Sequence, residues 1–380
     1  MRIVADRDIP GVEACFGQLG ELTRLPGREI DAAAVRDAEV LLTRSITRID
    51  DRLVAGSRLR FIGTCTIGTD HVDREALMSH DIDFASAPGC NAEAVVDQVL
   101  SCLLTEAQRQ GTELDRRCVG IVGVGHVGGR LFRRLSALGI ECLPCDPPRA
   151  AAEPSETFVD LDTIIARCDV ICLHTPLVGH GDDATRHLLD ARRIAALKPG
   201  TWLLNAGRGE CLDGIALRDR LQRQGDVTAI LDVWENEPAI DEALWRHVAI
   251  ATPHVAGYSL DGKLRATHQI YTALTTRFGL PRRQSFDTLT PPPALSSLTL
   301  SAGLAPWDAL RLCVRAVHDV RQEHDRLTLA RCEKGMPAGF DACRTGEVRR
   351  REFSTLTVAL EAEAAELAPW LSAAGFGVRS

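Results

Sequence analysis

Lysine, aromatic residues and long apolar runs are all scarce in this chain of 380 residues. Lysine occurs only at Lys198, Lys263 and Lys334, so arginine supplies almost all of the positive charge. Aromatic residues make up 4% of the chain, and the formal net charge is −8. An acidic chain of this kind lacks the concentrated basic face that binds phosphate backbones. We therefore expect no nucleic-acid partner.

Membrane and export signals are also missing. No apolar run approaches the length that crosses a bilayer, and residues 2–5 already have the pattern of a strand instead of a signal sequence. We expect a cytoplasmic protein with no membrane partner. The 13 cysteines are odd in number and scattered, which favours free, mostly buried thiols. Cys142 and Cys145 have redox-motif spacing but end a predicted strand, and no cysteine or histidine pair predicts a metal site.

The length is sufficient for two or three domains, and residues 1–94 predict the first of them. Short apolar runs at 2–5, 40–43, 60–63 and 82–85 alternate with helical segments such as 73–79. This alternation is typical of a small parallel α/β domain. Two strand ends carry polar residues, at 43–45 and 64–71, for which ordinary capping loops are the favoured interpretation. His71 is expected to cap or pack, not to catalyse.

A glycine-rich turn follows the predicted strand 118–122, after a long amphipathic helix at 91–110. The turn contains Gly123, Gly125 and Gly128 and leads into a predicted helix at 127–138, while the next strand, 140–145, ends in Asp146. Glycines let the backbone approach a pyrophosphate at a helix N-terminus. An acidic residue after the second strand accepts hydrogen bonds from ribose hydroxyls and repels a 2′-phosphate. The combination predicts NAD as the cofactor.

Further βα units extend this second domain. Strands are predicted at 169–173, 201–206 and 227–233, and helices at 160–167, 190–197 and 213–224. Thr175 lies just beyond a strand and is a candidate cofactor contact, whereas His174, His180 and His187 are interpreted as surface or loop residues. A helix at 260–278 is expected to return to the first domain. The predicted domains are 1–94 with 258–287, 95–257, and 288–380.

The C-terminal segment begins with a proline-rich linker at 288–293. Strands are predicted at 298–301 and 353–359, and helices at 307–318 and 361–374. The segment is interpreted as an accessory or dimerisation module. The run of Arg349, Arg350 and Arg351 is expected to be a solvated turn.

Four reactive side chains follow three consecutive apolar runs: Arg208 after 201–204, Asp232 and Glu237 after 227–231, and His254 after 248–251. Residues past the ends of parallel strands line the ligand crevice. A histidine moves a proton near neutral pH, a carboxylate orients it, and an arginine grips an anionic substrate with two parallel hydrogen bonds. Together they predict hydride transfer from an alcohol to NAD, with Asp232 supporting the cofactor side.

Four motifs together resemble the D-isomer-specific 2-hydroxyacid dehydrogenases: the glycine turn with Asp146, Asn205-x-x-Arg208-Gly209, Asp232 with Glu237-Pro238, and Thr252-Pro-His254. The resemblance implies an α/β fold with a Rossmann-type NAD-binding domain, a flavodoxin-like substrate domain and a C-terminal α+β dimerisation domain. It implies that Arg208, Glu237 and His254 are catalytic, with His254 transferring the proton.

The resemblance also assigns binding residues. NAD contacts are implied at Gly123, Gly125, Gly128, Asp146, Thr175, Ala206, Gly207, Arg208, Asp232 and Gly257. Substrate contacts are implied at Ser45, Thr66 and Tyr258. Gly207 departs from the family pattern, in which serine is common, so a hydroxyl contact there is lost while a backbone contact is retained.

Segments 63–72, 87–96, 145–149 and 254–263 are similar to one branch of the family, which forms homodimers and acts on a small phosphorylated 2-hydroxy acid. Two alternatives stay open. One is another D-2-hydroxy acid as substrate, such as 3-phosphoglycerate, and the other is an NAD-sensing interaction protein like the corepressors that share this fold. Arg44, beside Ser45, is a candidate ligand for the substrate phosphate.

Overall fold

The computed structural model describes residues 1–153, 158–345 and 348–379, and the chain divides into two compact units. The first unit comprises Met1–Ala92 and Tyr258–Pro292, and the second comprises Glu93–Gly257 and Pro293–Ser380. The C-terminal segment thus groups with the predicted NAD-binding region. The finer division into 1–94 with 258–287, 95–257 and 288–380 stays a prediction. Among the described residues, none of the helices combines the length and apolar composition that crossing a bilayer requires.

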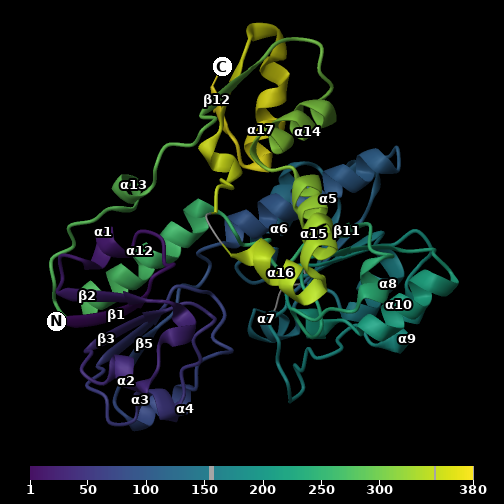
Figure 1. Ribbon diagram of the computed structural model, residues 1–380. Helices are drawn as coiled ribbons and strands as arrows, with labels where there is room; N and C mark the ends of the chain where they lie inside the picture. The colour runs from purple at the N-terminus through teal and green to yellow at the C-terminus, as the bar shows by residue number, and fades with distance from the viewer. Residues whose placement is uncertain (154–157, 346–347, 380) are drawn as a thin grey trace. The chain divides into compact units, whose positions relative to one another are not determined.

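The first unit is built on a five-stranded parallel sheet (Figure 1). Its strand order is β2-β1-β3-β4-β5, which is the flavodoxin-like order. The strands are β1 (Arg2–Asp6), β2 (Glu21–Leu25), β3 (Val40–Thr43), β4 (Phe61–Thr64) and β5 (Asp83–Ala85). The edge strand β2 was not predicted, because it has no fully buried residue and hence no apolar pattern.

Short helices connect these strands, and one long helix from later in the chain completes the unit. The helices between the strands are α1 (Val12–Phe16), α2 (Ala32–Val35), α3 (Asp51–Val54) and α4 (Arg74–Ser79), and a further short helix, α13 (Phe286–Leu289), follows the long one. Asp73 caps α4 by accepting a hydrogen bond from the Ala76 N–H. The long helix α12 (Leu260–Arg277) buries Ile270 and Tyr271 in the core of β1, β3 and β4. The expected return of the chain at 260–278 is thereby confirmed.

The second unit contains a six-stranded parallel sheet in the order β11-β10-β9-β8-β6-β7. Its strands are β6 (Val119–Val122), β7 (Cys142–Cys145), β8 (Val170–Leu173), β9 (Trp202–Asn205), β10 (Thr228–Leu231) and β11 (Ile250–Ala251). The chain runs outward in both directions from β6 and β8, so the topological switch point, where Rossmann-type folds bind ligands, lies between these two strands. The predicted Rossmann-type architecture is confirmed.

Helices cover both faces of this sheet, as parallel strands require. They are α5 (Ala92–Arg109), α6 (Gly128–Ala137), α8 (Leu161–Arg167), α9 (Ala191–Ala196), α10 (Gly214–Arg223) and α11 (Glu242–Trp245). The short helix α7 (Pro147–Ala152), which follows β7, buries no residue. Asp160, Asp190 and Asp213 each cap the helix that follows, which explains why these starts could be predicted within a residue.

The C-terminal segment forms a three-stranded parallel sheet in the order β12-β13-β14, with α14 and α17 beside it (Figure 1). The elements are β12 (Ser297–Leu300), α14 (Pro306–Val317), α15 (Val320–Lys334), α16 (Met336–Arg344), β13 (Thr357–Leu360), α17 (Ala368–Ala374) and β14 (Gly377–Arg379). Two expectations need correction. The strand expected at 353–359 starts with a 3₁₀ turn, Phe353–Thr355, and the first half of the helix expected at 361–374 is 3₁₀, Ala362–Leu367.

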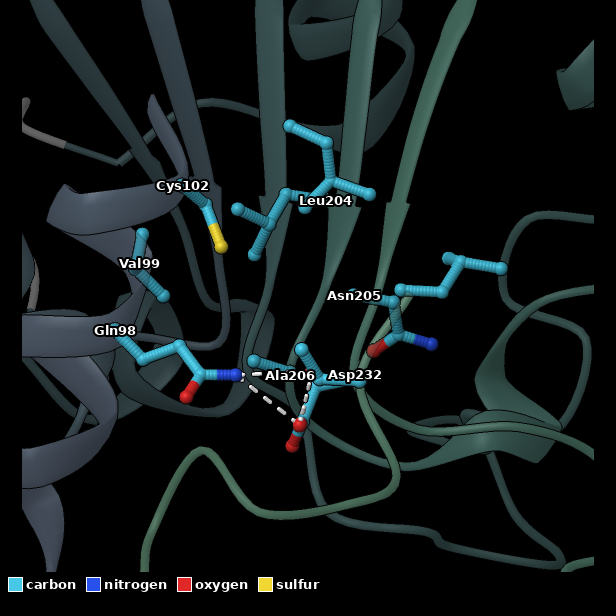
Figure 2. Close-up of a pocket in the computed structure, with 10 residues that line it drawn as sticks. Gln98, Val99, Cys102, Leu204, Asn205, Ala206 and Asp232 are labelled. Atoms are coloured by element: carbon cyan, nitrogen blue, oxygen red, sulfur yellow. Dashed lines mark hydrogen bonds between the residues drawn. The ribbon is translucent and has the colours of Figure 1, made fainter. Parts of the chain in front are cut away.

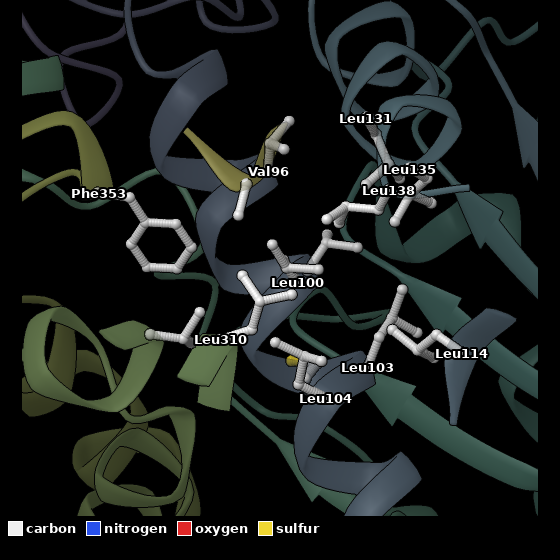
Figure 3. Packing of buried hydrophobic residues seen from close by; sticks show 14 of the residues in the cluster. Val96, Leu100, Leu103, Leu104, Leu114, Leu131, Leu135, Leu138, Leu310 and Phe353 are labelled. Carbon is white, nitrogen blue, oxygen red and sulfur yellow. The ribbon is translucent and has the colours of Figure 1, made fainter. Parts of the chain in front are cut away.

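The α5 helix is shared by two layers of the second unit (Figure 3). Leu103 packs in one cluster with Leu131 and Leu135 of α6, and the same cluster continues to Leu310 of α14 and to Phe353. All five side chains are completely buried. The C-terminal segment therefore shares a hydrophobic core with the six-stranded sheet.

Candidate active site

Three predicted catalytic residues lie past the ends of neighbouring strands. Arg208 follows β9, Glu237 follows β10 and His254 follows β11, and these strands are adjacent and parallel. Their C-terminal ends therefore meet at one edge of the second unit's sheet, as the sequence predicted. The side chains of Glu237 and His254 are partly exposed there, at 16% and 34%. That exposure leaves them accessible to a substrate.

Glu237 and His254 form a direct pair. The Glu237 Oε2 lies 2.7 Å from His254 Nδ1, and its Oε1 accepts a hydrogen bond of 2.9 Å from the Trp234 N–H. Both carboxylate oxygens are engaged, so the carboxylate is fixed in orientation and fixes the imidazole in turn. With Nδ1 held by Glu237, Nε2 is the nitrogen that can exchange a proton with a substrate.

The backbone at His254 is in the left-handed region, with φ 56°. Its N–H donates a 2.7 Å hydrogen bond to the Asp232 carbonyl, which joins the loop after β11 to the loop after β10. Residues other than glycine rarely adopt this backbone conformation, which costs about 1–3 kcal/mol. Surrounding contacts must therefore hold His254 in it.

Asp232 supplies much of that support, and its carboxylate is 5% exposed. Oδ1 accepts hydrogen bonds from Thr252 Oγ1 at 2.5 Å and from the Val255 N–H at 2.9 Å, while Oδ2 accepts one from the Ala256 N–H at 3.0 Å. Gln98 Nε2 adds a bond of 3.2 Å to Oδ1 (Figure 2). The structure thus gives Asp232 the role of folding the loop that carries His254, and its NAD contact stays a prediction.

Arg208 is presented by a loop that Asn205 closes. Asn205 Nδ2 donates to the Arg208 carbonyl at 2.9 Å, and Asn205 Oδ1 accepts from the Gly207 N–H at 3.1 Å. A Cβ added to Gly209 would lie 2.0 Å from the carbonyl carbon of Trp234, so only glycine permits this approach. The loop of Arg208 is therefore packed directly on the loop of Glu237.

The glycine turn has the geometry that a dinucleotide needs. A Cβ on Gly128 would lie 2.0 Å from the Gly123 carbonyl oxygen, so Gly128 lets α6 pack closely on the turn. A Cβ on Gly125 would meet nothing within 4 Å, so the backbone there faces open space. This open position lies at the start of α6, where N–H groups attract anions. The residues present therefore fit the pyrophosphate of a nucleotide.

Asp146 connects the second strand to the glycine turn. Its Oδ2 accepts a 2.7 Å hydrogen bond from the Val124 N–H, and its Oδ1 caps α7 through the Arg149 N–H at 3.1 Å. Arg149 returns to the same turn, with Nη1 donating to the Val124 carbonyl at 2.6 Å. The carboxylate is thus held beside the turn, where a ribose contact is predicted.

The peptide between His174 and Thr175 lies against two glycines. A Cβ on Gly123 would be 2.9 Å from the Thr175 nitrogen, and one on Gly207 would be 2.9 Å from the Thr175 carbonyl oxygen. In this chain, therefore, the departure from serine at Gly207 accompanies a close backbone approach. Thr175 and Ala206, both predicted cofactor contacts, follow the adjacent strands β8 and β9, with the Thr175 hydroxyl directed to Cys211 Sγ at 3.3 Å.

His174 lies in the loop after β8, as one of its two interpretations had it, but its ring is turned inward. Both ring nitrogens are buried and have no hydrogen-bond partner among the described residues. Burial lowers the pKa of this imidazole from 6.5 to about 4, so it is neutral at physiological pH. His180, by contrast, is exposed, and the largely exposed His187 pairs with Glu235 at 2.8 Å.

The first unit holds the predicted substrate residues. Ser45 follows β3 and is exposed, and Thr66 follows the adjacent strand β4, where its hydroxyl donates to the Gly68 carbonyl at 3.0 Å. Tyr258 precedes α12, with the Lys263 ammonium 4.1 Å from its ring centre. Burial lowers the pKa of His71, which lies 3.1 Å from Thr64 Oγ1 and therefore packs as expected.

Arg44, the candidate phosphate ligand, is already paired within the first unit. Its Nε lies 2.8 Å from Asp6 Oδ2 and its Nη2 lies 2.8 Å from Asp8 Oδ2. Two carboxylates therefore compensate its charge. Within the described ranges, no group of three or more His, Cys, Asp or Glu side chains is arranged to hold a metal ion.

Three polar residues near the reaction centre were not predicted from the sequence. Gln98 lies on α5, where its apolar neighbours hide it in the pattern of a buried face. Arg344, at the end of α16, has Nη1 3.6 Å from Glu237 Oε2. Arg350 donates to the carbonyl groups of Val255 and Ala256, so it is not in the solvated turn that was expected for residues 349–351. A run of arginines next to an apolar strand was the available signal.

Comparison with known proteins identifies the family. A family model described as the NAD binding domain of D-isomer specific 2-hydroxyacid dehydrogenases matches residues 91–256, and a domain of unknown function (DUF3410) matches residues 289–375. Erythronate-4-phosphate dehydrogenase of Chromohalobacter salexigens is 54% identical, covering 100% of this chain and 99% of its own. The enzyme of the same name from Azotobacter vinelandii is 50% identical, with 99% of both chains covered.

Solved structures share the fold. The TT0316 protein of Thermus thermophilus has a TM-score of 0.63 at 27% identity, covering 75% of this chain and 99% of its own. The NAD⁺-bound 3-phosphoglycerate dehydrogenase of Entamoeba histolytica has a TM-score of 0.63 at 22% identity, covering 73% and 95%, which shows the fold alone. The chain therefore belongs to the D-isomer-specific 2-hydroxyacid dehydrogenase family and is an NAD-dependent dehydrogenase of CH–OH groups.

Proposed function

We propose that this protein oxidises 4-phospho-D-erythronate at C2 with NAD, giving (R)-3-hydroxy-2-oxo-4-phosphooxybutanoate, as a step of pyridoxal 5′-phosphate (vitamin B6) biosynthesis. The observation that carries the chemistry is the His254–Glu237 pair of 2.7 Å at the strand ends, next to the loop of Arg208. The substrate rests on the relatives named erythronate-4-phosphate dehydrogenase, which match the chain over its whole length.

His254 is proposed to remove the proton of the C2 hydroxyl. Glu237 holds Nδ1, so Nε2 receives the proton, and the carboxylate stabilises the imidazolium that forms. When bound, NAD⁺ would supply the acceptor for the hydride of C2. Each turnover would then give one ketone, one NADH and one proton, which His254 takes up and releases to water.

Arg208 is proposed to bind the substrate carboxylate. Its guanidinium is planar and can donate two parallel hydrogen bonds to a carboxylate, which a lysine cannot do. The two hydrogen bonds of Asn205 fix the loop of Arg208. A fixed arginine of this kind sets the orientation of C2 relative to His254, and orientation is a large part of catalysis.

NAD is proposed to lie on the glycine turn at Gly123, Gly125 and Gly128, with its ribose at Asp146. The open backbone at Gly125 supports this placement. Thr175, Ala206, Gly207, Asp232 and Gly257 are the further contacts proposed for the cofactor. Ser45, Thr66 and Tyr258 are proposed for the substrate, since the exposed hydroxyl of Ser45 offers a neutral hydrogen bond to a polyhydroxy acid.

A cytoplasmic homodimer is proposed as the working form. The support is the C-terminal segment, where Leu312 of α14 is 43% exposed and Leu295 is 40% exposed. Leucines exposed on the helix beside the small sheet and just before its first strand favour contact with a second copy. Sedimentation at micromolar concentration is expected to give twice the chain mass, and a monomer would contradict the proposal.

Steady-state kinetics with NAD and two substrates test the proposed function. We expect kcat/KM for 4-phospho-D-erythronate to exceed that for 3-phosphoglycerate. A preference for 3-phosphoglycerate would overturn the substrate assignment and leave the dehydrogenase chemistry intact. Restored growth of a vitamin B6 auxotroph that lacks this step is the matching cellular result.

A further inference from the structure

Two charged side chains hold the two residues after His254 from opposite sides. The Asp232 carboxylate accepts hydrogen bonds from the N–H groups of Val255 and Ala256, at 2.9 and 3.0 Å. The Arg350 guanidinium donates to the carbonyl groups of the same two residues, at 3.4 and 3.0 Å. Val255 and Ala256 are 4% and 2% exposed, so all of these backbone groups need partners inside the protein.

Gln98 joins the two charges. Its Nε2 donates to Asp232 Oδ1 at 3.2 Å and to Thr252 Oγ1 at 2.9 Å, and its Oε1 accepts from Arg350 Nη1 at 2.9 Å. The amide is 2% exposed and lies on α5. A continuous buried network therefore runs from Asp232 through Gln98 to Arg350, and members of such networks fix one another's geometry.

Arg350 itself is fixed by α5. Its Nη2 donates to the Ala94 carbonyl, and the nearby Phe353 N–H donates to Asp97 Oδ2 at 2.8 Å. The guanidinium thus contacts α5 and the loop of His254 together. Burial lowers the pKa of Arg350, but arginine stays charged in proteins, so the carbonyl groups face a permanent cation.

A second arginine of the C-terminal segment reaches the same reaction centre. Arg344, at the end of α16, places Nη1 3.6 Å from Glu237 Oε2, the oxygen that holds His254. The C-terminal segment therefore reaches the surroundings of His254 at two places. Arg344 lies beside the Glu237 carboxylate that pairs with the imidazole, and Arg350 binds the backbone of the two residues after His254.

We propose that Arg350 is a positioning residue for the reaction, which holds the backbone that follows His254 and so makes the C-terminal segment part of the catalytic unit. The catalytic part of this inference rests on the proposed function, whereas the hold on residues 255 and 256 does not. Arg350 acts through His254 and touches neither substrate nor cofactor in this role.

Geometry explains why arginine is needed. A guanidinium donates from separate nitrogens in one plane: Nη1 of Arg350 serves the Gln98 amide and the carbonyl groups of Val255 and Ala256, and Nη2 serves the Ala94 carbonyl. Lysine keeps the charge but has a single nitrogen, so it can serve only some of these acceptors. A displacement of about 1 Å in a catalytic group can cost about 100-fold in rate.

The experiment compares Arg350→Gln, Arg350→Lys and, as a matched control, Arg349→Gln at the exposed neighbouring arginine. Thermal unfolding, sedimentation and NADH affinity are measured for each variant together with kcat and KM. We expect Arg350→Gln to lower kcat by about 100-fold with unchanged NADH affinity and assembly state. Arg350→Lys is expected to fall between Arg350→Gln and wild type, and Arg349→Gln to match wild type.

Amide hydrogen exchange reports on the loop without any turnover. We expect the amides of Val255 and Ala256 to lose protection in Arg350→Gln, while those of the central strand β6 keep it. If Arg350→Gln fails to fold, the same loss, smaller in extent, is expected in Arg350→Lys. A wild-type protein that does not oxidise the substrate would contradict the proposed function. Amide hydrogen exchange would still test whether Arg350 holds the backbone of Val255 and Ala256.

Three results would overturn the inference. One is wild-type kcat and loop protection in Arg350→Gln. Another is an equal loss of kcat in Arg349→Gln. The third is a loss of NADH affinity and assembly that accounts for the whole loss of kcat, since that outcome means a general structural role.

Discussion

The two large parallel sheets end in different kinds of loops. In the second unit, buried polar side chains close the loops that follow the strands: Asn205 and Asp232 are 0% and 5% exposed, and both bind backbone groups. In the first unit, Ser45 lies exposed after its strand, and the hydroxyl of Thr66 bonds to Thr64 and Gly68, each two residues away in the chain. Two parallel sheets thus carry loops that differ in how firmly buried hydrogen bonds hold them.

The difference follows the proposed division of labour. Proton transfer needs its groups held within a fraction of an ångström, so the His254 loop is bound by Asp232 and by Arg350. Hydroxyl groups that recognise a flexible polyol need less, because each contributes about 1 kcal/mol and a water molecule can substitute. The comparison predicts that changes in the second unit act on kcat, and changes in the first unit act on KM or on stability.

His254→Ala is expected to have the largest effect. Removal of the proton acceptor should lower kcat by about 10²–10⁴-fold, which is the usual contribution of general acid–base catalysis. NADH affinity should be unchanged, since His254 is not among the residues proposed to contact the cofactor. The measurement is steady-state kinetics with a fluorescence titration of NADH. Persistent turnover would show that another group accepts the proton.

Arg44→Ala tests the first unit through stability. Asp6 is 0% exposed and pairs with Arg44 at 2.8 Å, so removal of the cation leaves a buried charge that costs about 3–5 kcal/mol. Arg48→Ala is the control, because Arg48 is 84% exposed and pairs with Asp50 at the surface. Urea unfolding measures both. Equal stability of the two variants would contradict the prediction that Arg44→Ala leaves an unpaired buried charge on Asp6.

His174 predicts a pH dependence in the second unit. Its folded pKa of about 4 lies below the ordinary 6.5, so below pH 6.5 the unfolded state binds more protons than the folded state. Stability should therefore fall as the pH drops from 6.5 towards 4, by on the order of 3 kcal/mol from this residue. His174→Leu should flatten the profile of unfolding free energy in that window, and the exposed His180→Gln should not. An unchanged slope in His174→Leu would contradict the burial argument.

Ser45→Ala should have the smallest effect. Loss of one hydrogen bond of about 1 kcal/mol raises KM for the phosphorylated acid about fivefold and leaves kcat near wild type. Ser45→Ala should thus change KM, whereas His254→Ala should change kcat. A large fall in kcat would place Ser45 among the precisely held groups and would remove the distinction between the two sheets.

Much of the fold was predictable because its strands are buried apolar runs and its helices begin at aspartate caps. Elements without such signals were missed: β2 has no buried residue, and α15 buries only Val320 and Leu327 among polar neighbours. The site behaved in the same way. His254 and Glu237 were predictable because each follows a strand. The role of Asp232 in holding the His254 loop was not, because it depends on which backbone N–H groups donate to its carboxylate.

Contacts between distant segments were beyond the sequence. Arg350 reaches a loop 94 positions earlier in the chain, at Ala256, and no local pattern encodes that pairing. His174 was correctly expected in a loop, but the burial of its ring was not predictable, since it depends on the elements packed around the end of β8. Charge runs and lone histidines have the same local appearance on a surface and in a core.

Because the backbone at His254 is left-handed, with φ 56°, thermal stability and catalysis favour different residues at this position. Glycine and asparagine adopt such a conformation more easily than histidine does. A search for a more heat-resistant form of this protein would therefore select replacements at 254 that raise its melting temperature while it stops working. Screens that score survival alone would be misled at this residue, and libraries for thermal improvement should keep it fixed.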